Sequence, residues 1–120
     1  MRILVVTILL VAVFIWSVHE LPATLHTVNG NSMYPLLRSG QRVLVNRFAY
    51  RINPPAVDDV LVFRQPDSGT LMIKRVTAVM TGPSYDLRGD NSSESLDSRH
   101  FGVLREDAII GRVEFLGRNR

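Results

Sequence analysis

The sequence predicts an all-β protein, in which a small folded β-sheet or barrel follows one N-terminal transmembrane helix. The first 18 residues are almost entirely apolar, and Arg2 is their only charge. Beyond them, short runs of β-branched residues alternate with Gly, Pro and Asp turn signals. The length of 120 residues allows one small domain, and a hydrophobic content of 46% is typical of a globular fold. We therefore expect an anchor over residues 1–19 and a β domain over residues 20–120.

The apolar segment Met1–Val18 is expected to be a helical membrane anchor. Eighteen helical residues rise about 27 Å, close to the hydrocarbon core of roughly 30 Å. Arg2 and the amino terminus favour a cytoplasmic N-terminus, and Trp16 lies where an interfacial aromatic is typical. This orientation predicts a single-pass protein of the plasma (inner) membrane with its β domain on the outer (periplasmic) face. A cleaved signal peptide and a buried core helix are the alternatives, although no A-x-A site follows the run and no polar face interrupts it.

Five later segments have the composition of strands, and each follows or ends at a turn signal. Short strands with this punctuation are typical of a sheet that folds on itself. The predicted strands are Gln41–Phe48, Asp59–Pro66, Thr70–Met80, Ser84–Gly89 and Asp107–Leu116.

Composition excludes several classes of site. The absence of cysteine rules out disulfides, Cys-based zinc sites and a cysteine nucleophile. The net charge of +3 is small and scattered along the chain, so we expect no nucleic-acid partner. The polar loop after Gly89 has too few carboxylates for a calcium loop. We expect neither a metal nor another cofactor.

A hydroxyl nucleophile is predicted on the loop Val28–Pro35. Gly30 allows backbone geometries that other residues avoid, and Pro35 restricts the backbone of Tyr34. Ser32 would thus be held on a rigid loop close to the predicted membrane. An ordinary turn is the alternative, because Asn, Gly and Ser are all common turn residues.

A serine attacks a carbonyl only when a base accepts its proton. Lys74 is the only lysine among the 14 basic residues, and on a strand it would share a face with Met72 and Val76. Such apolar neighbours lower the pKa of an amine, which could then act as the base. A lysine that extends its ammonium group to water is the alternative. The other candidate bases are the three histidines, His19, His26 and His100. None of them shows a clear Asp-His-Ser arrangement.

The segment Gly89–Gly102 is too polar for a strand. Asp97 and Arg99 could form an ion pair that fixes this loop. Ser95 could then hydrogen-bond the Lys74 amine and orient it, as the third member of a triad does. A solvated Ser-rich loop is the alternative.

The order of these segments resembles that of the signal peptidase I family of membrane-bound serine endopeptidases. The resemblance covers about residues 1 to 113: the apolar anchor, GNSMYP at Gly30–Pro35, IKRV at Ile73–Val76, and the GDN and SLDSRHFG motifs within Gly89–Gly102. It implies a small all-β core that uses a Ser/Lys dyad to cleave leader peptides after small side chains. An extended substrate would pair with the strand edges near Val28–Gly30 and Met72–Lys74.

The resemblance implies a role for each candidate residue. Ser32 is implied as the nucleophile, Lys74 as the general base and Ser95 as the residue that orients Lys74. Asp97 and Arg99 are implied to hold the loop. The oxyanion hole and substrate contacts are expected from Gly30, Asn31, Met33, Met72, Asp90 and Asn91.

Some positions depart from the family pattern. Leu36 stands where Thr is usual, and Asp58 stands where Gly is common. Gly30 stands where some members carry a hydroxyl that helps to form the oxyanion hole. Backbone N–H groups, including that of Ser32, would then form most of the hole.

The interval between Lys74 and Gly89 is short, whereas larger bacterial members place an extra β domain there. This short core, the Asn46–Arg51 stretch and the DSRHFG motif at Asp97–Gly102 look most like the small nickel-type superoxide dismutase maturation proteases. That likeness implies removal of a propeptide from nickel superoxide dismutase. The alternatives are a general signal peptidase I, a self-cleaving repressor-type regulator and a non-catalytic membrane-anchored β module. The expected partners are a protein that bears a leader or propeptide and the lipid bilayer.

Overall fold

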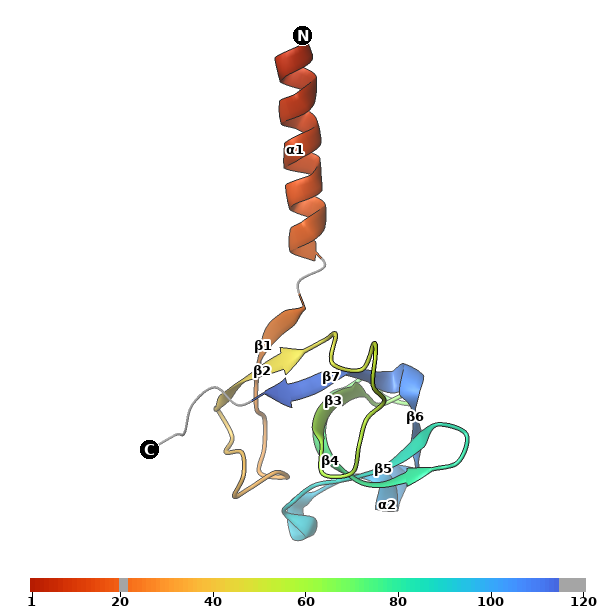
Figure 1. Cartoon of the computed structure of the whole chain (residues 1–120). Coiled ribbons are helices and arrows are strands. Elements are labelled where there is room, and N and C mark those ends of the chain that lie inside the picture. The colour runs from red at the N-terminus through yellow and green to blue at the C-terminus, as the bar shows by residue number, and fades with distance from the viewer. Residues whose placement is uncertain (20–21, 115–120) are drawn as a thin grey trace.

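The computed structural model describes the backbone of residues 1–19 and 22–114, and the side chains of residues 1–17 and 22–114. Helix α1 precedes seven strands, and a short helix, α2, lies between the fifth and sixth of them (Figure 1). The elements are α1 (Arg2–His19), β1 (Ala23–Thr27), β2 (Arg42–Asn46), β3 (Val60–Arg64), β4 (Leu71–Met80), β5 (Ser84–Arg88), α2 (Ser98–Phe101), β6 (Leu104–Arg105) and β7 (Ile109–Glu114). Two short 3₁₀ turns cover Ser92–Glu94 and Glu106–Ala108.

The strands form one curled antiparallel sheet in the order β1-β2-β7-β3-β4-β5-β6 (Figure 1). The prediction of a folded all-β sheet is therefore confirmed. Each of the five predicted strands is present within its predicted range. The end of the predicted strand Asp107–Leu116 lies outside the described residues. The sequence did not predict β1 or β6.

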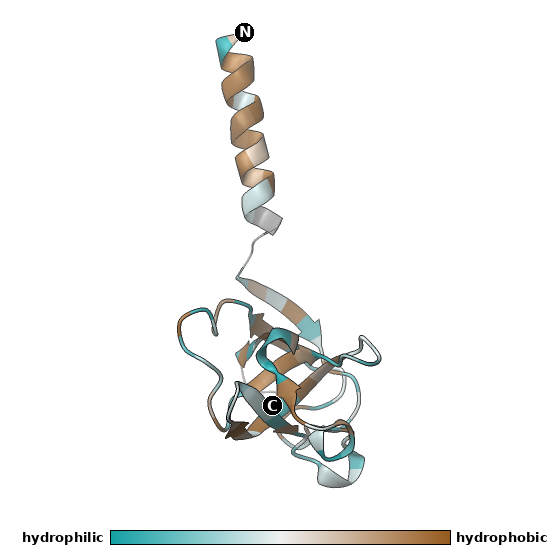
Figure 2. Ribbon diagram, turned by 90° about the vertical axis from the view of Figure 1, so that its right-hand side faces the viewer, coloured by the Kyte–Doolittle hydropathy of each residue, from teal (hydrophilic) through white to brown (hydrophobic). Residues whose placement is uncertain are grey.

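Strand β3 lies inside the sheet and separates two hydrophobic clusters, because successive side chains of a strand point to opposite faces. Val60 and Val62 belong to one cluster, and Leu61 and Phe63 belong to the other. Figure 2 shows the apolar strands of the core in brown inside the domain. Leu61 is also the register partner of Lys74 in β4. The predicted base thus lies beside the most buried strand of the sheet.

Helix α1 stands apart from the sheet, and its apolar side chains are exposed (Figures 1 and 2). Ile3 is 83% exposed and Trp16 is 70% exposed. The helical conformation agrees with the prediction, but the predicted transmembrane span over residues 1–19 is not supported. The 18 helical residues of α1 rise only about 27 Å. Within the part of the chain that the structure describes, no helix combines the length and the apolar character needed to cross a membrane.

Asp58 precedes β3 in a backbone conformation that favours glycine. Its φ of 75° lies in the left-handed region, where a Cβ atom is disfavoured. The conformation allows Asp58 N–H to donate to Val76 O, while Val76 N–H donates to Asp59 O; both distances are 2.8 Å. These bonds continue the ladder between β3 and β4 and explain why glycine is common here in the family that the chain resembles.

Replacing Asp58 with glycine is expected to stabilise the protein by about 1 kcal/mol, because glycine removes the cost of a left-handed conformation at a residue with a Cβ atom. Urea unfolding of the wild type and the variant measures the change in the free energy of unfolding. The control is Asp58→Ala, which loses the carboxylate but keeps the Cβ atom and should give no such gain. Equal stabilisation by both variants would assign the effect to charge and contradict the backbone explanation.

Candidate active site

Ser32 and Lys74 are 42 residues apart in sequence but in direct contact. The Lys74 Nζ donates a hydrogen bond to the Ser32 Oγ at 2.9 Å. Lys74 is 5% exposed, and this burial lowers its pKa, although the negative charge of Asp97 acts in the opposite direction. The predicted pair is therefore brought together in surroundings that favour the neutral amine.

The loop after β1 holds Ser32 through backbone bonds at its base. The Val28 N–H donates to Gln41 O at 2.8 Å, and the Gly40 N–H donates to Val28 O at 2.7 Å. Gly30 has a φ of 84°, and its N–H donates to Ser39 Oγ at 3.1 Å. These contacts fix the segment on both sides of the turn that carries Ser32.

Buried apolar side chains also anchor this segment. Met33 is 1% exposed and Leu37 is completely buried, both in the cluster that contains Val62. The peptide bond between Tyr34 and Pro35 is cis. The chain therefore enters the core directly after Ser32.

A second loop, which begins at Gly89, supports the Ser32 loop from the other side. The Asn91 N–H donates to Ser32 O at 2.8 Å, and its side-chain Nδ2 donates to Asn31 O at 3.1 Å. A Cβ atom at Gly89 would lie 2.6 Å from Ser32 O and would overlap Ser95 Oγ. The sequence analysis assigned Gly89 to a motif but did not identify this contact. The two loops are in van der Waals contact only because residue 89 has no side chain.

Asp97 is completely buried and organises the second loop. It accepts hydrogen bonds from Arg99 Nε at 2.9 Å and Nη2 at 2.7 Å, so the predicted ion pair is present. It also accepts from Ser95 Oγ at 2.7 Å and from the Gly89 N–H at 3.0 Å. Burial alone would raise the pKa of Asp97, but these bonds outweigh it and hold the pKa well below the usual range.

Ser95 does not make the contact that the sequence analysis expected. Its hydroxyl proton is directed to Asp97, and no hydrogen bond joins Ser95 to Lys74 among the described residues. The Ser95 Oγ lies against the position where Gly89 lacks a Cβ atom. A role for Ser95 in orienting Lys74 stays a prediction.

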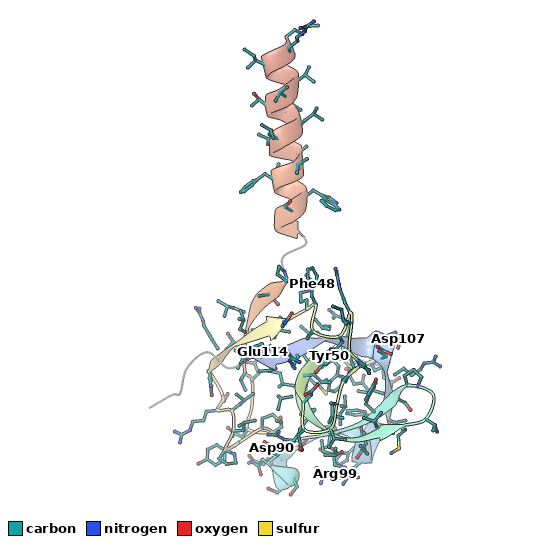
Figure 3. All side chains as sticks on the ribbon, viewed as in Figure 1. Phe48, Tyr50, Asp90, Arg99, Asp107 and Glu114 are labelled. Atoms are coloured by element: carbon teal, nitrogen blue, oxygen red, sulfur yellow. The ribbon has the colours of Figure 1, made fainter. Side chains whose placement is uncertain are left out.

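Asp90 pairs with Arg75, the residue after Lys74. The Arg75 Nε and Nη2 each reach an Asp90 carboxylate oxygen at 2.9 Å, and Nη1 donates to Asp58 O at 2.9 Å. Asp90 and Arg99 lie at the same end of the β domain (Figure 3). Arg75 in β4 thus forms an ion pair with the start of the polar loop. Arg99 forms an ion pair within the loop.

A groove of about 440 Å³ runs past Ser32 and Lys74. Residues 26–33 and 70–74 line it, together with Val62, Glu94 and Leu96. Four of the predicted substrate or oxyanion residues line the groove, whereas two are in the supporting loop and are not among the lining residues. The first group is Gly30, Asn31, Met33 and Met72, and the second is Asp90 and Asn91.

The strand edges beside this groove are available for pairing. β1 pairs with β2 on one side only, and Leu71–Lys74 pair with β3, whereas the described pairing with β5 begins at Arg75. The two segments expected to bind an extended peptide both line the groove.

The histidines lie in other surroundings. The His26 Nε2 is 3.0 Å from Thr24 Oγ1 and lines the groove, while His100 Nδ1 accepts the Asp97 N–H at 3.2 Å and so caps α2. The side chain of His19 lies outside the described residues. Among the described hydrogen bonds, none joins a histidine to Ser32.

Comparisons with known proteins agree with this architecture. The chain is 28% identical to "Probable signal peptidase I-1" of Synechocystis in an alignment 132 positions long, with 73% of this chain and 67% of that protein covered. It is 25% identical over 164 residues to "Signal peptidase IB" of Staphylococcus aureus, covering 92% and 86%. It is 25% identical over 136 residues to "Thylakoidal processing peptidase 1, chloroplastic" of Arabidopsis thaliana, where it covers 74% of itself but only 40% of the relative.

The sequence profile of one family matches nearly the whole chain, over residues 1–83 and 82–117. The family is described as "Signal peptidase, peptidase S26". The match includes the Ser32 loop, β4 with Lys74 and the loop from Gly89 to Gly102. The chain belongs to the peptidase S26 family of signal peptidases.

Proposed function

We propose that the chain is a serine endopeptidase of the signal peptidase I type, which removes an N-terminal leader or propeptide from a substrate protein. The observation that carries the proposal is the hydrogen bond of 2.9 Å between the buried Lys74 amine and the Ser32 hydroxyl at the groove. Family membership supports the same reaction class. In this proposal Ser32 and Lys74 form the catalytic dyad.

The reaction begins when the neutral Lys74 amine takes the proton of the Ser32 hydroxyl and the Oγ attacks the scissile carbonyl carbon. The resulting ammonium group returns the proton to the leaving amine as the peptide C–N bond breaks. Water then attacks the acyl-enzyme, with Lys74 again accepting a proton. The products are two peptides and the regenerated Ser32 hydroxyl.

The Ser32 N–H is the proposed donor to the oxyanion. Within residues 22–114, no protein acceptor is described for this N–H, whereas the Gly30 N–H already donates to Ser39 Oγ. One preorganised donor of this kind typically stabilises the transition state by about 3 kcal/mol. The geometry thus favours Ser32 over Gly30 for this role.

The substrate is proposed to bind as an extended strand between Val28–Gly30 and Met72–Lys74. Both segments line the groove, and the described pairing of β4 with β5 begins only at Arg75, which leaves one edge of Met72–Lys74 available for hydrogen bonding. Addition of a strand supplies affinity through backbone bonds and leaves specificity to the side-chain pockets. Met33 and Val62 are buried and close the groove with apolar surface, which favours small apolar side chains near the cut.

Two kinds of substrate protein are proposed. A propeptide of nickel superoxide dismutase is proposed because the short β4–β5 interval and the Asp97–Gly102 motif resemble the proteases that mature this enzyme. Leaders of exported proteins are the second candidate, because the relatives include signal peptidases.

We also propose that α1 associates with a lipid bilayer, because its exposed side chains are almost all apolar. The expected outer-face location of the β domain stays a prediction. Protease protection of the C-terminus in intact cells tests it, since a domain on the outer face would be digested without lysis.

Cleavage by the purified full-length chain tests the peptidase function. A leader peptide with alanine one and three positions before the cut is expected to give two products, identified by mass spectrometry. Ser32→Ala should reduce cleavage to background, whereas the control Ser84→Ala should not, because Ser84 lies at the start of β5 and outside the groove. Cleavage that survives in Ser32→Ala would contradict the proposal. A Ser32→Ala variant that still performs the function of the protein in cells would favour the non-catalytic β module.

A further inference from the structure

We propose that Glu94 determines specificity by favouring substrates with a cationic side chain just after the cleaved bond. This inference rests on the proposed peptidase function and names a feature of its substrates. It begins from the charges in the groove. The ionisable side chains that line it, within the described residues, are His26, Lys74 and Glu94.

Glu94 is the only one of these three that offers a negative charge. Lys74 is buried, and its Nζ donates to the Ser32 hydroxyl. Glu94 is exposed at the groove. A bound peptide therefore meets a carboxylate at the rim of the groove, while the Lys74 amine is engaged by Ser32.

The supporting loop fixes the position of this carboxylate. The Asn91 Nδ2 donates to both Glu94 Oε2 and Asn31 O, each at 3.1 Å, and the Asn91 N–H donates to Ser32 O. One amide side chain thus connects the carboxylate to the residue before the nucleophile. Glu94 is held at the Ser32 end of the groove.

The Glu94 carboxylate also has an unused oxygen. Four other carboxylates of the domain are in ion pairs with arginine. Glu94 forms no ion pair among the described residues, and its Oε1 accepts no hydrogen bond there. In a chain with 14 basic residues, this acid is thus available to a cation from outside.

The position along the groove indicates which part of the substrate Glu94 meets. The residues before the cut lie along Val28–Gly30 in the proposed binding mode, and the carbonyl carbon lies at Ser32. We place the residues after the cut on the side of Ser32 where Asn91 holds Glu94 beside Asn31. A lysine or arginine at the first or second position after the cut would therefore reach the carboxylate.

Paired peptides test the inference. They differ only in lysine or glutamine at the first or second position after the cut, and the readout is the ratio of their kcat/KM values. We expect Glu94→Gln to lower the lysine preference about twofold to fivefold, as befits a solvent-exposed ion pair. The amide introduced by this substitution keeps an oxygen for Asn91, so the loop contact is retained. Glu94→Lys should reverse the preference, and high ionic strength should weaken it in the wild type.

Glu106→Gln is the control for the loss of one negative charge, because Glu106 lies in a 3₁₀ turn away from the groove. This control should keep the wild-type ratio. An unchanged ratio in both Glu94 variants would overturn the inference while Ser32-dependent cleavage of both peptides leaves the proposed function intact. Absence of Ser32-dependent cleavage of either peptide would overturn both.

Discussion

Lys74→Arg is expected to lose peptide cleavage as completely as Lys74→Met, a fall in kcat of about two to four orders of magnitude. Arginine keeps a positive charge and hydrogen-bond donors but cannot give up its proton at any pH that a folded protein tolerates. In the structure Lys74 Nζ donates to the Ser32 Oγ, so only loss of a proton from this nitrogen turns it into an acceptor. Steady-state cleavage of the leader peptide measures the loss. Appreciable turnover by purified Lys74→Arg protein would contradict the dyad.

The pH dependence of the wild type follows from the same group. Burial lowers the pKa of Lys74, so the rate should rise with pH as the amine becomes neutral and level off above its folded-state pKa. A rise that follows a group near pH 6.5, the ordinary range of histidine, would point instead to a histidine base.

Stability gives a second readout for Lys74. Since its pKa is lower in the folded protein than in the unfolded chain, the unfolded state binds more protons between the two pKa values, and stability rises with pH there. The penalty is present below the unfolded pKa of about 10.4 and disappears above it. Lys74→Met should therefore be more stable than the wild type at neutral pH, while it loses activity. A less stable methionine variant would mean that Lys74 serves the fold.

The features that could be predicted from the sequence are those that local patterns encode. Runs of β-branched residues between turn signals were sufficient for β2, β3, β4, β5 and β7. The alternation along β4 also placed Lys74 on the face of Met72 and Val76, where burial acts on its amine. The resemblance to signal peptidases then joined Ser32 to Lys74, a contact across 42 positions that no local pattern contains.

The features that could not be predicted depend on contacts between distant segments. Strand β1 has alternating exposure and pairs only with β2, so its sequence ATLHT shows no continuous apolar run. Asp90 was expected to contact the substrate, but it forms an ion pair with Arg75, which lies in β4. The predicted range of α1 agrees with the helix that the structure shows, but its 18 residues are at the lower limit for crossing a bilayer, and the structure does not support a span.

Gly89→Ala is expected to reduce kcat about a hundredfold, the effect of moving a catalytic group by about 1 Å. The new Cβ atom would lie 2.6 Å from the Ser32 carbonyl oxygen and 2.6 Å from the Ser95 Cβ, and it would overlap the Ser95 Oγ. The Ser32 carbonyl cannot rotate away, since it also accepts the Asn91 N–H. The loop of the nucleophile and the loop of Asp97 must therefore separate, which alters the distance between Ser32 and Lys74. Cleavage kinetics and urea unfolding together measure the two consequences.

Gly82→Ala is the matched control, because Gly82 lies in the turn between β4 and β5, where a Cβ atom has open space. Its φ of 75° makes alanine costly there, so this control should lower stability by up to about 1 kcal/mol without changing kcat. The comparison separates a loss of stability from a displaced nucleophile. If Gly89→Ala proves too unstable to assay, adding Ser95→Gly removes the two contacts with Ser95 and should restore part of the stability, while the contact with the Ser32 carbonyl still holds kcat down. A Gly89→Ala protein with the kcat of the wild type would show that the two loops tolerate separation, and that the position of Ser32 does not depend on the close contact at residue 89.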